Sequence, residues 1–211
     1  MEKIIEQLHA VGIVPVVKIE DAEKASPMAQ ALKKGGICCA EITFRTEAAE
    51  QAIRNIAASH PEFLIIAGTV LTEDQADRAM KAGATALVSP GFDEQLVAYC
   101  QKKHYPIIPG VCNASEIARA LRMGLKYLKF FPAEQAGGVA MIKALAAPYG
   151  MVRFMPTGGI NAENVGTYLK NKSVFACGGS WLVPSDAMAN GDFKRIEDLT
   201  REACERRKEI Q

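Results

Sequence analysis

The sequence predicts one α/β domain, a (β/α)8 barrel (TIM barrel) with an extra helix at its N-terminus. The 211 residues alternate short apolar runs with longer amphipathic segments from start to end. Eight such runs follow one another at intervals of roughly 20 to 26 residues, and no linker divides residues 1–211 into two domains. An open doubly wound sheet is the alternative, but no G-x-G-x-x-G motif follows the first run.

The predicted strands are nearly continuous apolar runs, as expected where both faces of a strand are covered. They are 13–18, 38–43, 64–69, 86–90, 106–110, 127–132, 152–157 and 174–179. Segments 1–10 and 192–209 are predicted as the first and last helices. Side chains that suit a helix N-cap precede several amphipathic segments: Asp21, Thr72, Asp93, Asn113 and Asn161. Glycines that suit a left-handed C-terminal cap follow them: Gly35, Gly36, Gly83, Gly124 and Gly150.

The charge balance excludes several classes of partner. The chain has 25 Lys and Arg against 24 Asp and Glu, a net charge of +1, so it lacks the basic excess that binds nucleic acid or an anionic membrane. No uncharged apolar stretch approaches the ~18 residues of a membrane span, and the N-terminus has no signal-peptide pattern. We expect a cytoplasmic protein that acts on a small molecule or a protein partner.

Cysteine and histidine spacing predicts no metal site and no other cofactor. The six cysteines form no C-x-x-C pair, and the three histidines show no paired ligand spacing. We expect free, buried thiols rather than disulfides.

Lys129 is the most informative single residue. Active sites of such barrels lie at the carboxyl ends of the strands, and strand alternation places Tyr127, Lys129 and Phe131 on one face. A buried lysine must be paired with an anion or be held as the neutral amine. The neutral amine is the nucleophile of Schiff-base chemistry. The alternative interpretations are a structural ion pair and a lysine on an edge strand whose amine extends into solvent.

Glu41 and Arg45 add a carboxylate and a cation to the same end. Glu41 shares a strand face with Cys39 and Thr43, and Arg45 follows the strand end. Glu41 is a candidate general acid/base, and Arg45 suits bidentate binding of a substrate carboxylate. A salt bridge from Glu41 to Lys129 or Arg45 without a catalytic role remains open.

Two glycine pairs indicate a phosphate site. Thr157-Gly158-Gly159 and Gly178-Gly179-Ser180 end the last two predicted strands, where barrels commonly bind phosphate through backbone N–H groups. Tight turns are the alternative interpretation. Thr69, Pro90 and Phe131 are further candidates to line the barrel mouth, although each also suits packing.

In combination, several motifs make the sequence resemble the family of 2-keto-3-deoxy-6-phosphogluconate (KDPG) and 4-hydroxy-2-oxoglutarate (KHG) aldolases. They are AEITFRT (40–46), AGTV (67–70), VSPG (88–91), IPG (108–110), LKFFPAE (128–134), FMPTGGI (154–160) and GGSWLVP (178–184). The resemblance implies a class I aldolase on a (β/α)8 barrel, usually a homotrimer. It would cleave the phosphorylated keto acid KDPG to pyruvate and glyceraldehyde 3-phosphate.

The resemblance also implies a role for each matching residue. Lys129 would form the imine, and Glu41 would be the acid/base. The remaining positions would bind substrate: Arg45 and Thr69 the pyruvate carboxylate, Pro90 and Phe131 the reacting carbons, and Gly159, Gly179 and Ser180 the phosphate. Thr157 would help to decide which C4 configuration is accepted, and Gly158 of the same glycine pair is a further substrate-binding candidate. Two positions depart from the family pattern, Lys18 where Arg is frequent and Asn113 where Thr is frequent.

Several functions remain open at this level. Within the same chemistry, the substrate could be the galactonate epimer or KHG. A phosphosugar isomerase or epimerase would use the glycine loops and Glu41 without an imine, and a noncatalytic phosphosugar-binding barrel would need the loops alone.

Overall fold

The chain alternates strands and helices as predicted. The computed structural model describes residues 1–208, which contain nine strands and ten α-helices. The strands are β1 (Ile13–Val17), β2 (Cys39–Thr43), β3 (Leu64–Gly68), β4 (Ala86–Val88), β5 (Ile107–Ile108), β6 (Gly110–Val111), β7 (Tyr127–Phe130), β8 (Arg153–Pro156) and β9 (Cys177–Gly179). The helices are α1 (Glu2–Val11), α2 (Ala25–Gly35), α3 (Ala49–Ser59), α4 (Glu73–Ala82), α5 (Glu94–Lys102), α6 (Ala114–Arg122), α7 (Gly138–Ala146), α8 (Val165–Leu169), α9 (Ser185–Asn190) and α10 (Phe193–Lys208).

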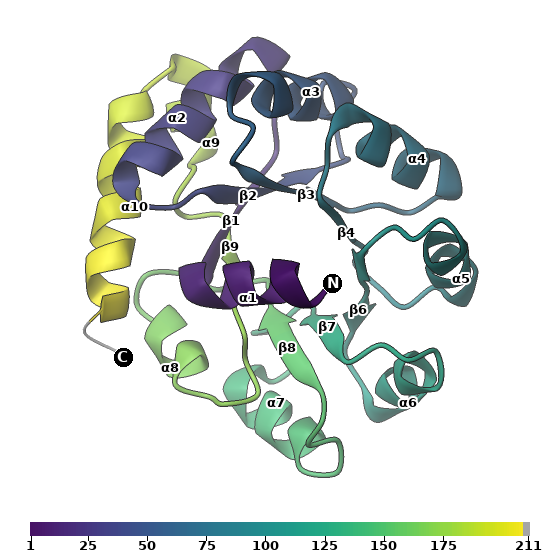
Figure 1. The fold of residues 1–211 in the computed structure, drawn as a ribbon. Coiled ribbons are helices and arrows are strands. Elements are labelled where there is room, and N and C mark those ends of the chain that lie inside the picture. The colour runs from purple at the N-terminus through teal and green to yellow at the C-terminus, as the bar shows by residue number, and fades with distance from the viewer. Residues whose placement is uncertain (209–211) are drawn as a thin grey trace.

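The prediction of one closed eight-stranded (β/α)8 barrel is wrong. The strands form two parallel sheets, one of six strands in the order β5-β4-β3-β2-β1-β9 and one of three in the order β6-β7-β8. The two sheets surround a common centre, the helices cover their outer faces, and α1 lies across one end (Figure 1). The fold is therefore α/β with parallel strands, but its hydrogen-bond ladder is not continuous.

The ladder is interrupted at two places. The predicted strand 106–110 divides at Pro109, whose nitrogen carries no hydrogen to donate, so Ile107 and Ile108 pair with β4 while Gly110 and Val111 pair with β7. Between β8 and β9 only isolated bridges form, Phe154 to Val174 and Thr157 to Gly178. The first half of the predicted strand 174–179 is consequently irregular.

Most predicted helix starts are confirmed by side-chain caps. Thr72 accepts a hydrogen bond from the Gln75 N–H, Asp93 from Gln95 and Leu96, and Asn113 from Glu116. Asp21 caps the short 3-10 helix Ala22–Lys24. Asn161 caps a turn instead, accepting from the N–H groups of Glu163 and Asn164 before α8 begins at Val165.

The predicted glycine caps at the helix ends are confirmed in part. Gly36, Gly83 and Gly124 have the positive φ of a left-handed cap, whereas α7 ends at Ala146, four residues before Gly150. The predicted first helix is α1, and the predicted last helix is α10, with Glu209 outside the described residues.

All six cysteines are free. No helix among residues 1–208 is long and apolar enough to cross a membrane.

Candidate active site

Lys129 and Glu41 meet between the two sheets. Glu41 lies mid-strand on β2 and Lys129 on β7, with 0% and 4% of their surfaces exposed. Lys129 Nζ donates to Glu41 Oε1 at 3.0 Å and to Oε2 at 3.4 Å. Two residues 88 positions apart in the chain thus form one buried ion pair, in agreement with the predicted strand faces.

Phe131 and Gly68 lie in close contact with the Glu41–Lys129 pair. Lys129 Nζ lies 5.4 Å from the centre of the Phe131 ring, as their shared strand face predicts, and a cation is attracted to such a ring face. Gly68 on the neighbouring β3 leaves room for the carboxylate, because a Cβ there would lie 2.1 Å from Glu41 Oε1. A side chain at position 68 is incompatible with the observed position of Glu41.

Arg45 is held above the strand end by Thr43. Its Nε donates to Thr43 Oγ1 at 3.2 Å, and that hydroxyl donates to the Val17 carbonyl at 3.1 Å. Among residues 1–208, Arg45 forms no ion pair with Glu41, so of the two predicted salt bridges only Glu41–Lys129 exists. Arg45 is exposed and its guanidinium edge remains open for an anion.

Backbone hydrogen bonds link the segments that follow β2, β3 and β4 at the carboxyl ends of the strands, the mouth of the site. The N–H of Phe44, beside Arg45, donates to the Gly68 carbonyl, which precedes Thr69. The Val70 N–H donates in turn to the Val88 carbonyl, two residues before Pro90. Thr69 has a φ of 56°, a strained backbone for a threonine, and is partly exposed.

Pro90 reaches the lysine strand through Gly110. A Cβ on Gly110 would lie 2.2 Å from the Pro90 oxygen, and Gly110 pairs directly with Lys129. The structure therefore places Arg45, Thr69 and Pro90 around the carboxyl ends of β2 to β4, next to the buried pair.

The two glycine loops lie side by side on the other part of the mouth. Thr157 forms a bridge with Gly178, and a Cβ on Gly178 would lie 2.3 Å from Thr157 Oγ1. That hydroxyl oxygen is buried and has no hydrogen-bond partner among residues 1–208. Gly158 and Gly159 have φ values of 105° and 77°, which favour glycine.

Gly179 and Ser180 complete the second loop. Trp181 packs so closely over Gly179 that a Cβ would lie 1.8 Å from its ring, while Ser180 is exposed. The loop geometry thus needs its glycines for close approach as well as for turning.

The cysteine thiols and the metal-ligating side chains near the site are poorly suited to catalysis. Burial raises the pKa of the Cys39 thiol on β2 and of the Cys177 thiol on β9 far above the usual range, so both remain protonated. No group of three or more His, Cys, Asp or Glu side chains among residues 1–208 could hold a metal ion. Lys18, one departure from the family pattern, is exposed and pairs with Glu20 at 2.5 Å.

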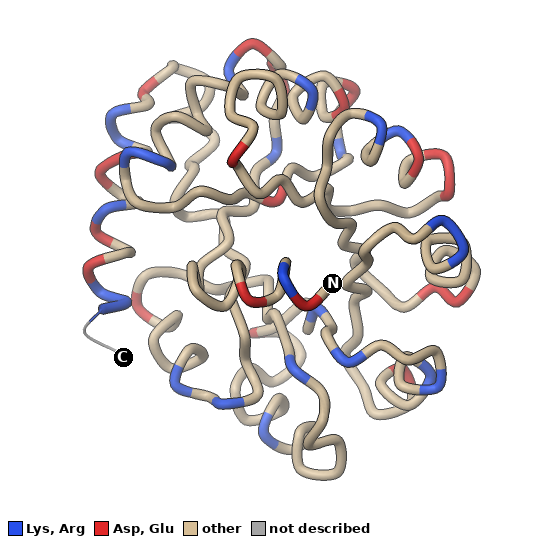
Figure 2. Tube along the Cα trace, in the orientation of Figure 1, with Lys and Arg blue, Asp and Glu red and all other residues tan. Residues whose placement is uncertain are grey.

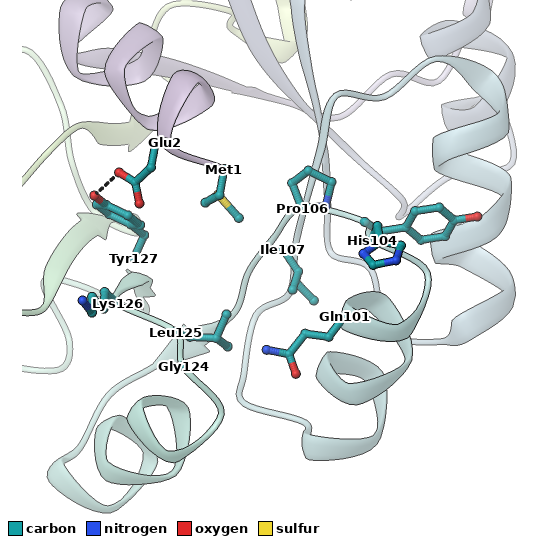
Figure 3. A pocket seen from close by; sticks show the side chains of 11 residues that line it. Met1, Glu2, Gln101, His104, Pro106, Ile107, Gly124, Leu125, Lys126 and Tyr127 are labelled. Atoms are coloured by element: carbon teal, nitrogen blue, oxygen red, sulfur yellow. Dashed lines mark hydrogen bonds between the residues drawn. The ribbon is translucent and has the colours of Figure 1, made fainter.

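Charges elsewhere on the chain are dispersed. Acidic and basic residues are both spread over the outer helices (Figure 2), and the net charge of the whole chain is +1. A cavity of about 420 Å³ opens at the opposite end of the molecule, lined by α1 and by residues that precede β5 and β7 (Figure 3). This cavity is separate from the Lys129 site, because it lies at the amino ends of the strands.

Sequence reasoning missed two residues of this site. Thr43 orients Arg45, although its place at the end of β2, two residues before Arg45, was a usable signal. Glu134 lies against Gly159, and nothing in the spacing of the chain predicts that contact.

The fold and the site define an α/β enzyme with the residues of a Schiff-base centre. The chain belongs to the KDPG and KHG aldolase family, whose sequence model matches residues 4–199. It is 49% identical over 205 residues to the 2-dehydro-3-deoxy-phosphogluconate aldolase of Treponema pallidum, covering 97% of this chain and 98% of that protein.

Two further relatives extend the comparison. The KHG/KDPG aldolase of Escherichia coli is 48% identical over 193 residues, covering 92% of this chain and 91% of that one. The crystal structure of KDPG aldolase from Legionella pneumophila, with pyruvate captured as a covalent carbinolamine, has a TM-score of 0.92 and 40% identity, covering 95% of this chain and 97% of that one.

Proposed function

We propose that this protein is a class I aldolase that cleaves KDPG to pyruvate and D-glyceraldehyde 3-phosphate. The observation that carries the proposal is the buried contact between Lys129 Nζ and Glu41 Oε1, 3.0 Å apart. Relatives that share nearly the whole chain are named for this activity, and the Legionella protein holds pyruvate as a carbinolamine, the adduct that precedes an imine. An isomerase or a noncatalytic phosphosugar-binding barrel would have no use for the buried lysine.

Imine formation begins with a proton transfer inside the pair. The Glu41 carboxylate accepts a proton from the Lys129 ammonium, and the neutral amine attacks the C2 carbonyl of the substrate. Glu41 then returns the proton to the carbinolamine hydroxyl, which leaves as water. The product is a cationic imine, and the Glu41 carboxylate is regenerated.

Carbon–carbon cleavage uses the same two residues. Glu41, directly or through water, takes the proton of the C4 hydroxyl as the C3–C4 bond breaks. The bonding electrons move to the iminium, giving an enamine and releasing the aldehyde. Protonation of C3 and hydrolysis of the imine release pyruvate and restore Lys129.

The remaining side chains are assigned to substrate binding. Arg45 and Thr69 bind the pyruvate carboxylate, and Pro90 and Phe131 pack against the reacting carbons. Thr157, whose hydroxyl has no partner among residues 1–208, helps to select the C4 configuration. Gly158, Gly159, Gly179 and Ser180 hold the phosphate through backbone N–H groups and a hydroxyl.

Borohydride reduction in the presence of pyruvate tests the proposal. We expect a stable adduct with the mass of a reduced pyruvyl imine, mapped to the peptide that contains Lys129 and absent from Lys129→Ala. Folding of the variant is checked by circular dichroism. An adduct on another lysine, or none on the folded wild type, would contradict the proposal.

The substrate range and the assembly need separate measurements. A kinetic panel with KDPG, its galactonate epimer and KHG ranks the substrates, and we expect KDPG to be preferred to KHG because the glycine loops suit a phosphate, which KHG lacks. The family resemblance predicts a homotrimer, and sedimentation equilibrium measures the number of subunits. The cytoplasmic location stays a prediction from the sequence.

A further inference from the structure

Glu134 braces the loop that precedes α8. It follows the lysine strand, and its side chain lies directly over Gly159, where a Cβ would be 2.6 Å from Glu134 Cγ and 2.7 Å from its Cβ. Its own N–H donates to the Gly158 carbonyl at 3.1 Å. One residue thus contacts both glycines of the loop through its backbone and its side chain.

Tyr168 fixes the carboxylate of Glu134. The tyrosine lies on α8 with 1% of its surface exposed, and its hydroxyl donates to Glu134 Oε1. Burial and this hydrogen bond raise the pKa of the phenol well above its usual range, so it remains a donor. Gly138 leaves space for the contact, because a Cβ there would lie 3.2 Å from the Tyr168 hydroxyl oxygen.

A second hydrogen bond, from Asn164, fixes the Gly158–Gly159 loop. Asn164, immediately before α8, donates from its Nδ2 to the Gly159 carbonyl at 3.0 Å. The loop is therefore tied to α8 by Asn164 and to the chain after β7 by Glu134, and the bond to Tyr168 joins Glu134 to α8 as well.

We propose that Tyr168, acting through Glu134, is a positioning residue that shapes the Gly158–Gly159 loop for the phosphate of the substrate. The inference rests on the proposed function, which assigns the phosphate to this loop. Glu134 is exposed, so without the tyrosine its carboxylate loses its fixed orientation. A mobile carboxylate beside the loop would repel a phosphate dianion, and the loop would lose its brace.

The Tyr168→Phe variant tests the inference. We expect the KM for KDPG to rise about tenfold, the size of effect expected for one hydrogen bond to a charged group, while kcat changes by less than about twofold. The rate of borohydride trapping with pyruvate, which carries no phosphate, should remain at the wild-type value.

Two substitutions at Glu134 separate charge from bracing. Glu134→Gln keeps an acceptor for the tyrosine hydroxyl, so we expect a KM for KDPG within about twofold of wild type or below it. Glu134→Ala should raise this KM about as much as Tyr168→Phe, and the double variant should add little because both changes remove one contact. Because Glu134 is exposed, these variants remain informative if Tyr168→Phe fails to fold.

Tyr127→Phe is the matched control. Tyr127 donates to Glu2 Oε2 at 2.7 Å at the far end of the molecule (Figure 3), so this variant removes the same kind of hydrogen bond away from the loop. We expect no change in KM. An unchanged KM in Tyr168→Phe and Glu134→Ala, or equal losses in KM and in pyruvate trapping, would overturn the inference. Failure of the proposed function itself would show separately, as absent trapping and cleavage in the wild type.

Discussion

At the scale of single residues, the proposed catalytic roles of Glu41 and Lys129 fall on a pair that also affects stability. Each is almost wholly buried, so each charge is neutralised by the other. Removing one partner leaves an unpaired buried charge, which typically costs about 3–5 kcal/mol of folding free energy. We therefore expect substitutions at these two positions to change activity and stability together. A substitution at a residue beside the pair tests its geometry without removing either charge.

The Gly68→Ala variant tests whether catalysis depends on the geometry of the Glu41–Lys129 pair. The new Cβ would lie 2.1 Å from Glu41 Oε1, so the carboxylate must turn away from Lys129. Because Glu41 is the proposed acid/base, we expect kcat for KDPG cleavage to fall by about 100-fold or more. Steady-state kinetics and the rate of pyruvate trapping measure the loss, and circular dichroism verifies the fold.

Gly91→Ala is the control for this change. Gly91 also follows a strand of the mouth, but an added Cβ meets no atom within 4 Å and its φ is not positive. We expect its kcat to remain within about twofold of wild type, as for most surface substitutions. Equal activity in the two variants would show that Glu41 does not need its observed position.

The residues of the buried pair were predictable because strand alternation is local. It placed Lys129 and Phe131 on one face of their strand and Glu41 on one face of another strand, and the structure shows that these two faces meet. The contact of Glu134 with Gly159 joins segments that follow two different strands. No local periodicity encodes such a contact, so it required the structure.

At the scale of elements, the starts of helices were predicted better than the ends of strands. A cap depends on a side chain and a backbone N–H only two or three residues apart, as in Thr72 and Asn113. A strand ends where its neighbour stops pairing, which depends on distant residues. Pro109 is the exception, because its missing N–H is visible in the sequence and explains the division between β5 and β6.

The contact of α2 with α10 depends on one glycine. Gly35 is buried at the end of α2, and a Cβ there would lie 2.4 Å from Thr200 Cβ and 2.8 Å from the Glu197 carbonyl oxygen. Gly35→Ala forces the helices apart, so we expect the free energy of unfolding to fall by about 1–3 kcal/mol. Urea denaturation followed by circular dichroism measures the change.

Gly150→Ala is the comparison for this prediction. Its Cβ would meet nothing within 4 Å, and its φ is not positive, so we expect a change within about 0.5 kcal/mol. A Gly35→Ala variant as stable as wild type would show that α10 can shift on α2 without cost.

At the scale of the whole molecule, strand spacing could not predict the continuity of the ladder. Eight βα units arranged around a centre give the same spacing whether or not every neighbouring pair completes its hydrogen bonds. The isolated bridges Phe154–Val174 and Thr157–Gly178 show pairing that stops after single residues. The order of the elements follows from the sequence, whereas the division into two sheets follows from long-range contacts.

The dispersed charges predict a weak dependence of catalysis on salt. With a net charge of +1 and acidic and basic residues both spread over the helices (Figure 2), the molecule has no basic field to steer an anionic substrate. We therefore expect attraction to come at short range, from Arg45 and the glycine loops that are proposed to bind the substrate. We expect kcat/KM for KDPG to fall by less than about threefold between about 50 and 500 mM NaCl.

The Arg45→Gln variant distinguishes local from long-range attraction. It removes the exposed guanidinium that Thr43 orients, so kcat/KM should fall by about tenfold or more at every salt concentration, with a salt dependence as shallow as that of wild type. Stopped-flow or coupled assays across the series measure both quantities. A decline of more than about tenfold in the wild type would instead require a steering field that extends beyond a Debye length.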